Sequence, residues 1–174
     1  FALPAIWGRR VISVFIGGGT PSLFSAAAID RLLAGIRARV PLSPDAEVTL
    51  ETNPGTFERE KFAGFRAAGV NRVSLGVQSF DDGALQRIGR IHGADEARRA
   101  VAEVREGGIG NLNLDLMYAL PGQDLAGALR DVEAAVALAP EHVSHYHLTL
   151  EPNTLFAAHP PALPDEDSAW DMQE

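Results

Sequence analysis

Three consecutive glycines, Gly17–Gly19, directly follow the apolar segment 11–16, and Thr20, Pro21 and Ser22 come next. Because glycine has no Cβ, such a loop can take positive φ angles and expose backbone N–H groups to a polar ligand. No lysine follows, which excludes a P-loop, and Ser22 stands where a dinucleotide fingerprint needs its third glycine. The loop therefore predicts a backbone cradle for a polar small molecule, with a tight strand-to-helix turn as the alternative.

Polar side chains also stand at the carboxyl ends of the other expected strands. Glu51 ends the second strand, Gln78 ends the third, and Asp115 lies in the fourth. Parallel α/β folds place their sites at these strand ends, and burying such groups without partners is costly. We expect a polar ligand to be their partner. Three alternatives stay open: Glu51 pairing with a neighbouring loop, Asp115 holding a local arginine, and Arg90 being a solvated charge at a helix end.

The third strand adds a steric argument for a ligand at this end of the sheet. Ser74, Gly76 and Gln78 alternate along it and share one face. Two small residues below a glutamine leave room for a bound group above them.

A pair of histidines on the last expected strand suggests a different chemistry. His145 and His147 lie two residues apart, with Glu151 on the same face, and a His-x-His pair on a strand can bind a metal. A metal-dependent barrel hydrolase is therefore an alternative. Against it, the single lysine, Lys61, lies early in an expected helix and is poorly placed to bridge metals.

Five apolar segments alternate with helical ones along the chain. The expected strands span 11–16, 47–52, 71–78, 110–117 and 143–150. The expected helices span 25–40, 57–68, 81–88, 94–107 and 124–138. This alternation predicts parallel strands joined by crossover helices, and five strands are too few for an eight-stranded barrel of ~200 residues or more. We expect an α/β fold, a parallel partial TIM barrel truncated at both ends.

Helix caps and apolar stripes agree with these boundaries. Helix starts are expected to be capped by Ser25, Thr56 and Asp81. Left-handed helix stops are expected at Gly69, Gly89 and Gly107. One helical stripe comprises Ile29, Leu32, Leu33, Ile36 and Val40. A second comprises Leu125, Leu129, Val132 and Val136.

Composition limits the classes of partner. The 174 residues carry a formal net charge of −8, which argues against nucleic acid as a main partner. The chain has no cysteine, so it holds no disulfide, zinc finger or iron–sulfur cluster of its own. It shows neither an apolar run near the ~20 residues of a membrane span nor a signal peptide, and we expect a cytoplasmic location. Residues 1–157 are predicted to form a partial core of five βα units, and 158–174 a linker and the start of a further region.

Six motifs occur in an order that resembles one protein family. They are Gly-Gly-Gly-Thr-Pro-Ser (17–22), Glu-Thr-Asn-Pro-Gly-Thr (51–56), Gly-Val-Asn-Arg-Val-Ser-Leu-Gly-Val-Gln-Ser-Phe (69–80), Ile-Gly-Arg-Ile-His (88–92), Asn-Leu-Asp-Leu-Met-Tyr-Ala-Leu-Pro-Gly-Gln (113–123) and Leu-Thr-Leu-Glu-Pro-Asn-Thr (148–154). The chain resembles the radical S-adenosylmethionine (SAM) family that includes oxygen-independent coproporphyrinogen III oxidase and related heme chaperones. The resemblance implies a part TIM barrel, SAM and a [4Fe–4S] cluster held by three cysteines.

By this resemblance, eight residues are expected to contact SAM. They are Gly18, Gly19, Thr20, Glu51, Gln78, Arg90, Asp115 and Thr149. The glycine loop and Glu51 match positions around the methionine part. Gln78, Arg90 and Asp115 match residues that the oxidase uses around a second SAM. Thr149 stands at a contact position where the residue type differs from the family.

The sequence departs from the family pattern in one major respect. The family's Cys-x3-Cys-x2-Cys motif is absent, so this chain supplies no metal ligands, its catalytic residues stay unknown, and alone it is expected to hold no cluster. The motif is expected before Phe1. The wording of the motifs favours the heme-chaperone branch, which implies heme or porphyrin and a heme-accepting respiratory protein as partners. Oxidative decarboxylation of coproporphyrinogen III to protoporphyrinogen IX is the alternative, and whether the protein is an enzyme stays open.

Overall fold

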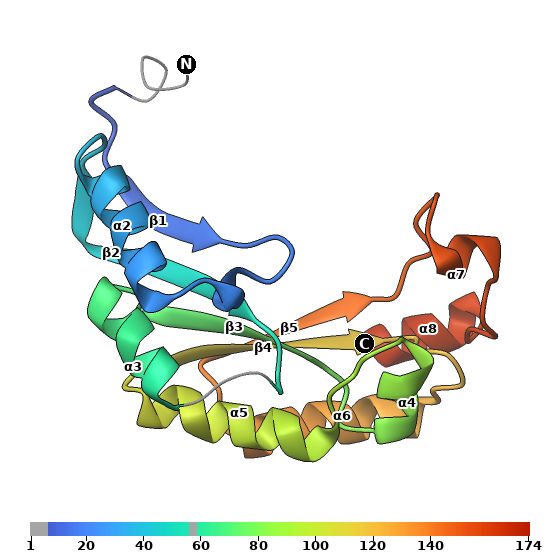
Figure 1. Cartoon of the computed structure of the whole chain (residues 1–174). Coiled ribbons are helices and arrows are strands. Elements are labelled where there is room, and N and C mark those ends of the chain that lie inside the picture. Colours follow the sequence, from blue (N-terminus) through green and yellow to red (C-terminus); the bar gives the residue numbers. More distant parts are fainter. Residues whose placement is uncertain (1–6, 56–58) are drawn as a thin grey trace.

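The computed structural model describes residues 7–55 and 59–174 and contains one curled sheet of five parallel strands (Figure 1). The strands lie side by side in chain order, as β1 (Val11–Ile16), β2 (Leu42–Thr52), β3 (Arg72–Gln78), β4 (Asn111–Tyr118) and β5 (His142–His147). The helices are η1 (Pro21–Leu23), α2 (Ala26–Arg37), α3 (Arg59–Ala68), α4 (Asp82–Arg87), α5 (Ala94–Glu106), α6 (Leu125–Ala137), α7 (Leu155–Ala158) and α8 (Glu166–Gln173). This curled half-barrel confirms the expected partial TIM barrel.

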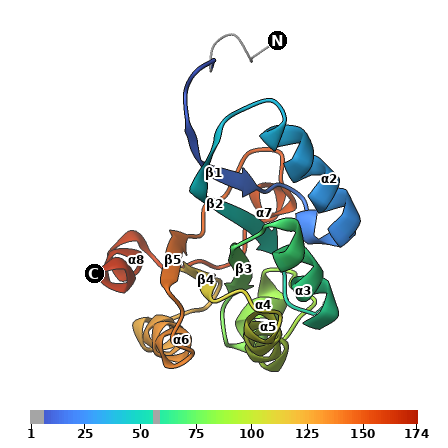
Figure 2. The same cartoon turned by 90° about the vertical axis from the view of Figure 1, so that its left-hand side faces the viewer.

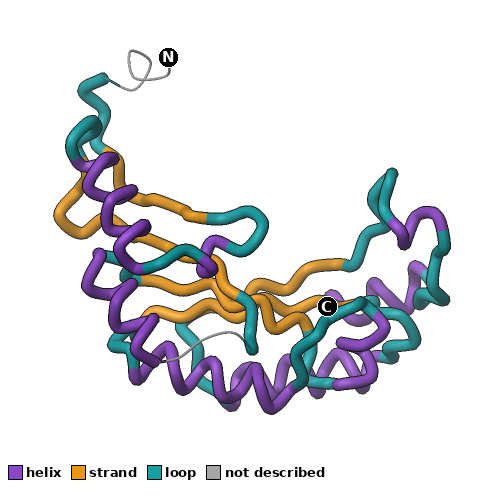
Figure 3. Tube along the Cα trace, in the orientation of Figure 1, coloured by secondary structure: helices purple, strands orange, loops and turns teal. Residues whose placement is uncertain are grey.

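The two faces of the sheet differ in polarity. Helices α2, α3, α5 and α6 cover the convex face, as the end-on view shows (Figure 2). Along β4, Leu112, Leu114 and Leu116 are fully buried in the core. Asn113 and Asp115, which alternate with them, line a cavity on the concave face. The loops that follow the strands gather at one end of the sheet (Figure 3), so this end and the concave face form the surface available for a site.

Two strand boundaries differ from those expected by more than one residue. β2 begins at Leu42 because the segment before Glu47 already runs beside β1, where the Val11 amide donates to the Pro41 carbonyl. β5 ends at His147 because its paired strand, β4, ends at Tyr118. A strand paired on one side only has no ladder to continue once that neighbour stops.

The caps of α2 and α4 are confirmed at Ser25 and Asp81, whose side chains accept the amides of Ala28 and Ala84. The third expected cap, Thr56, lies outside the described residues.

Two of the three expected helix stops are confirmed. Gly69 and Gly89 take φ angles of 110° and 73°. The expectation for Gly107 is wrong, because this residue continues the right-handed turn with a φ of −71°. Its neighbour Gly108, at 86°, makes the left-handed step one residue later.

The expected apolar stripe of α6 is confirmed at Val132, which packs against the core, and is wrong at its other positions. Ala128, Asp131 and Ala135 are buried, whereas Leu129 and Val136 are 52% and 62% exposed. Hydrogen bonds from the loop after β3 to Asp131 hold this face of the helix inward. The buried face of α6 thus combines apolar contacts of Val132 and Ala135 with a polar contact of Asp131, which the hydrophobic pattern of the sequence does not predict.

The C-terminal segment folds back on the sheet. The chain from 159 to 165 has no regular structure, and α8 follows it, capped by the Asp165 side chain. Ala169 and Met172 of α8 pack with Tyr118 and Ala128. We did not expect this helix, and the domain boundary after residue 157 stays a prediction. No helix in the described parts of the chain is long and apolar enough to cross a membrane.

Candidate functional site

A polar cavity of about 210 Å³ lies at the carboxyl ends of β1 to β4. Its lining residues are Gly19, Thr20, Pro21, Glu51, Thr52, Asn53, Ser74, Gly76, Gln78, Arg90 and Asp115. Six of the eight residues expected to contact SAM are among them, and a seventh, Gly18, is bonded to one of them. Segments far apart in the sequence therefore meet where parallel strands end, as the sequence predicts.

The glycine loop after β1 is joined to the end of β2. Gly18 and Gly19 take φ angles of 87° and 60°, a region that favours glycine. The Gly18 amide donates a 2.8 Å hydrogen bond to Oε2 of Glu51. A Cβ at Gly17 would lie 2.6 Å from Cε1 of Phe15 and 2.9 Å from the same Glu51 oxygen. Glycine is thus needed at 18 and 19 for the backbone conformation and at 17 for lack of space. The alternative that Glu51 pairs with a neighbouring loop is also observed, because its partner is this glycine loop.

Gln78, which lines the cavity, lies at an irregularity in the pairing of β3 with β4. The pairing with β4 shifts between Leu75 and Gln78, and Gln78 takes a φ of 70°, which is unusual for a residue with a Cβ. A Cβ at Gly76 would lie 2.8 Å from Oδ1 of Asn53 and 3.1 Å from Nε2 of Gln78. A side chain at Gly76 would therefore collide with two lining residues, and Gly76 itself lines the cavity. That the space is occupied by a bound group stays a prediction.

Asp115 belongs to a hydrogen-bond network on the concave face. The Ser74 hydroxyl donates to Oδ2 of Asp115 at 2.9 Å, and Nδ2 of Asn113 donates to Oδ1 at 2.8 Å. Burial raises the pKa of the Asp115 carboxyl, while these two hydrogen bonds act in the opposite direction. The hydrogen-bond partners of Asp115 in the structure are thus Ser74 and Asn113. Arg72, which lines the concave face with Asp115, acts on its carboxyl through charge alone, so the alternative of a local arginine is supported only as a weak electrostatic contribution.

Arg90 reaches the cavity from the turn after α4. Its Nη1 donates to Oδ1 of Asn53 at 3.4 Å, and burial lowers the pKa of its guanidinium. The alternative of a solvated helix-end charge is therefore wrong. Asn53 is outside the set of expected SAM contacts. Two sequence signals point to it: its place two residues after Glu51, at the same strand end, and its position within the 51–56 motif.

A second cavity, of about 410 Å³, adjoins the first along the concave face. The two cavities share Glu51, Ser74, Gln78 and Asp115. The second is lined further by Arg72, Asn113, Met117, Ser144, Phe15 and Tyr146. A ligand with a charged end in the first cavity therefore has continuous space for a larger, partly apolar remainder.

Thr149 is not among the residues that line either cavity. It lies beyond the end of β5 and is exposed, and its hydroxyl donates to Oε1 of Glu151 at 2.8 Å. Its contact with SAM stays a prediction.

The two histidines of β5 pack against an aromatic ring. The rings of His145 and His147 lie 4.7 Å and 5.1 Å from that of Tyr118. Burial lowers the pKa of His145, which favours its neutral form. Among residues 7–55 and 59–174, no three His, Cys, Asp or Glu side chains are grouped so as to hold a metal ion. The metal-hydrolase alternative therefore gains no support.

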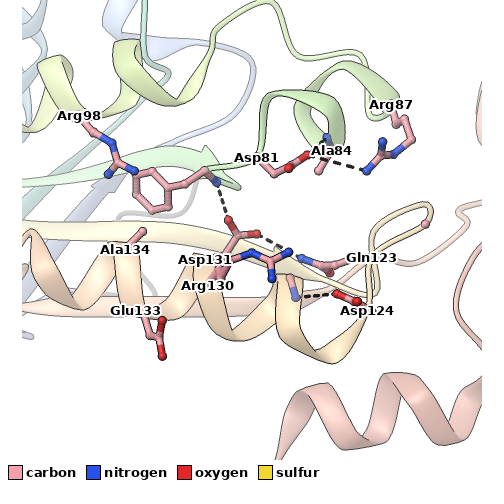
Figure 4. Close-up of a pocket in the computed structure, with 13 residues that line it drawn as sticks. Asp81, Ala84, Arg87, Arg98, Gln123, Asp124, Arg130, Asp131, Glu133 and Ala134 are labelled. Carbon is pink, nitrogen blue, oxygen red and sulfur yellow. Dashed lines mark hydrogen bonds and ion pairs between the residues drawn. The ribbon is translucent and has the colours of Figure 1, made fainter.

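Asp131 is a buried polar group that the sequence motifs do not single out. It is 3% exposed, and burial raises its pKa against the hydrogen bonds that it accepts from Phe80 and Ser79. It lines a cavity of about 660 Å³ that is also lined by residues of α4, α5 and α6 (Figure 4). Its spacing could have indicated its burial, because it lies three residues after Ala128 and four before Ala135, on the buried face of α6.

Comparison with known proteins agrees with this geometry. Residues 4–139 match the model of the Radical SAM superfamily. The chain is 54% identical over 167 residues to the heme chaperone HemW of Escherichia coli, covering 96% of this chain and 44% of that protein. It is 52% identical over 170 residues to the heme chaperone HemW of Haemophilus influenzae, covering 98% and 44%. The chain thus spans less than half the length of these relatives.

Among solved structures, the chain is similar to coproporphyrinogen III oxidase (HemN) from Escherichia coli, described as a radical SAM enzyme. The two superpose with a TM-score of 0.83 at 30% identity, over 98% of this chain and 40% of that one.

Proposed function

The chain belongs to the radical SAM superfamily, and from that membership we propose that it forms the SAM-binding part of a heme chaperone. The observation that carries the proposal is the convergence of the glycine loop, Glu51, Gln78, Arg90 and Asp115 on one cavity. The 54% identity to a heme chaperone over nearly the whole chain supports the choice of branch.

The residues of the cavity fit the chemistry of SAM. Its methionine end carries an ammonium and a carboxylate. Glu51 offers a carboxylate that the Gly18 amide already orients, and Arg90 offers a partly buried guanidinium. The resemblance relates Arg90 and Asp115 to a second SAM, but both line the same cavity as Glu51, so we propose that they serve one SAM. An arginine suits a carboxylate, and a carboxylate suits an ammonium. The ribose hydroxyls suit Asp115, and the adjoining cavity has room for the nucleoside.

The superfamily uses SAM together with a [4Fe–4S] cluster, which supplies its reductive chemistry. Cluster ligands are thiolates, and this chain contains no cysteine. The residues present therefore do not fit the cluster, and we propose that ligands outside this chain hold it. What this chain contributes is the binding and orientation of SAM.

Heme binding is the test of the chaperone proposal. The protein that carries this chain, expressed from its complete gene, is titrated with heme, and the Soret band is followed. We expect a saturable shift with a defined stoichiometry. Absence of saturable heme binding, in protein shown to be folded by circular dichroism, would overturn the proposal. Transfer of bound heme to a respiratory acceptor protein is the expected second step.

The oxidase alternative is favoured by one observation, the similarity in structure to coproporphyrinogen III oxidase. An anaerobic assay with SAM, a reductant and coproporphyrinogen III distinguishes the two. Formation of protoporphyrinogen IX and carbon dioxide would favour the oxidase. Cleavage of SAM without decarboxylation would favour the chaperone. A cytoplasmic location stays part of the proposal.

A further inference from the structure

One buried carboxylate connects two loops that follow neighbouring strands. Asp131 of α6 accepts hydrogen bonds from the Phe80 amide at 2.6 Å and from the Ser79 hydroxyl at 2.7 Å. It also accepts one from Nε2 of Gln123 at 3.2 Å. Figure 4 shows Asp131 pointing toward Gln123 and the loop before α4. Both carboxylate oxygens are therefore occupied by donors from outside its own helix.

Each of these loops follows a residue in the left-handed region. Gln78, with a φ of 70°, immediately precedes Ser79. Ala119, with a φ of 57°, precedes Leu120, whose amide donates to Oε1 of Gln123. Residues with a Cβ rarely adopt such angles, and they keep them where the surrounding contacts hold the chain. Asp131 supplies such contacts to both turns, directly after β3 and through Gln123 after β4.

Further hydrogen bonds connect the loop held by Asp131 to α4, which precedes Arg90. The Ser79 hydroxyl accepts the amide of Asp81, which caps α4. Nε of Arg87, in the last turn of α4, donates to the Pro121 carbonyl at 2.6 Å. Arg90 follows α4 after one short turn. The segment 79–87 is thus hydrogen-bonded to α6 and to the loop after β4. Gln78 directly precedes this segment, Arg90 follows it by three residues, and both line the 210 Å³ cavity.

We propose that Asp131 is a positioning residue of the SAM site, which sets the places of Gln78 and Arg90 by fastening the segment between them. The inference rests on the proposed binding of SAM. It assigns a physical role to Ser79, Phe80 and Gln123, motif residues that do not line the cavity. It also explains why a carboxylate occupies the buried face of α6, since no apolar side chain of that size accepts three hydrogen bonds.

The test uses Asp131→Asn in the protein expressed from its complete gene. The amide keeps one acceptor oxygen and presents an NH2 group to donors, so at least one hydrogen bond is lost. We expect SAM affinity, measured by calorimetry, to fall at least tenfold. Without ligand, we expect faster amide hydrogen exchange at residues 78–81. Glu133→Gln, an exposed change on the same helix, should alter neither. Gln123→Ala removes its bond to Asp131 and the bond that it accepts from the Leu120 amide, but it leaves the bonds from Ser79 and Phe80 to Asp131. It should give a smaller loss of SAM affinity, and it serves as the test should Asp131→Asn fold poorly.

A double-mutant comparison separates positioning from general stability. Asp131→Asn introduced into a Gln78→Ala, Arg90→Ala background should weaken residual SAM binding no further. An additive loss would overturn the inference. So would a lower Tm for Asp131→Asn with unchanged SAM affinity and unchanged exchange at 78–81. If the wild-type protein binds no SAM, the proposed function fails, and the exchange comparison still decides whether Asp131 orders the segment.

Discussion

The backbone amide of Gly18 lies 2.8 Å from Oε2 of Glu51 and donates a hydrogen bond to it. This contact joins the loop after β1 to the end of β2, two segments 33 residues apart in the sequence. The carboxylate is thereby oriented by the backbone before any ligand arrives. The loop and the carboxylate form one unit, and changes in either should affect ligand binding together.

Glu51→Gln should weaken SAM binding with little effect on stability. Glutamine can still accept the Gly18 amide, but it lacks the charge that an ammonium needs. A hydrogen bond to a charged group contributes about 1.5–3 kcal/mol, so affinity should fall roughly tenfold to hundredfold. Calorimetric titration with SAM measures this loss, with Glu106→Gln, an exposed change on α5, as control. Unchanged affinity would show that Glu51 does not bind a cationic group of the ligand.

Gly17→Ala should disturb the glycine loop from within. The added methyl group would lie 2.6 Å from Cε1 of Phe15 and 2.9 Å from Oε2 of Glu51, closer than such atoms approach. Phe15 is 60% exposed and can rotate away, so the main cost falls on Glu51. We expect SAM affinity to fall tenfold or more while Tm changes little. Gly110→Ala, with nothing within 4 Å of its Cβ, is the matched control.

Gly76→Ala tests whether the small cavity is the ligand site. Its methyl group would press on Oδ1 of Asn53 and Nε2 of Gln78, at 2.8 Å and 3.1 Å, and would occupy cavity space. SAM binding should be lost or weakened at least tenfold, while circular dichroism stays that of the wild type. Wild-type affinity in this variant would place the ligand elsewhere on the concave face.

His92 should make stability depend on pH in the weakly acidic range. It is 5% exposed, its Nε2–H donates to the Val77 carbonyl at 3.1 Å, and burial lowers its pKa. A histidine with a lowered pKa contributes stability above its unfolded value of about 6.5 and loses it as pH falls through the folded value. The free energy of unfolding in urea should therefore decrease from pH 6.5 downward.

The variant His92→Gln keeps a donor for Val77 without titrating, so this decrease should become smaller. His145, whose pKa burial also lowers, contributes with the same sign and accounts for part of what remains. His159→Gln, at an exposed position, serves as control. A pH profile of His92→Gln identical to that of the wild type would contradict the expectation.

Much of the site could be predicted because a polar residue at the end of an apolar strand can be recognised from its sequence neighbours alone. Gly19, Glu51, Gln78 and Asp115 each stand where an apolar run stops or alternates, and parallel topology brings such ends together. Thr149 does not line the cavity, which is formed by residues of β2 to β4 and of the segments after β1 to β3 and includes none from β5. Which strand ends share a cavity depends on how the sheet curls, and the sequence of a single strand does not contain that information.

By itself, the sequence determined the alternation of strands and helices, the glycine loop and the polar groups at four strand ends, because these follow from local conformation and hydrophobic pattern. Only the tertiary structure decided which groups contact one another. The Gly18–Glu51 contact, the Arg90–Asn53 contact and the burial of Asp131 each join segments distant in sequence. The physical reason is that a hydrogen bond depends on the position of both partners, and the curvature of the sheet sets those positions.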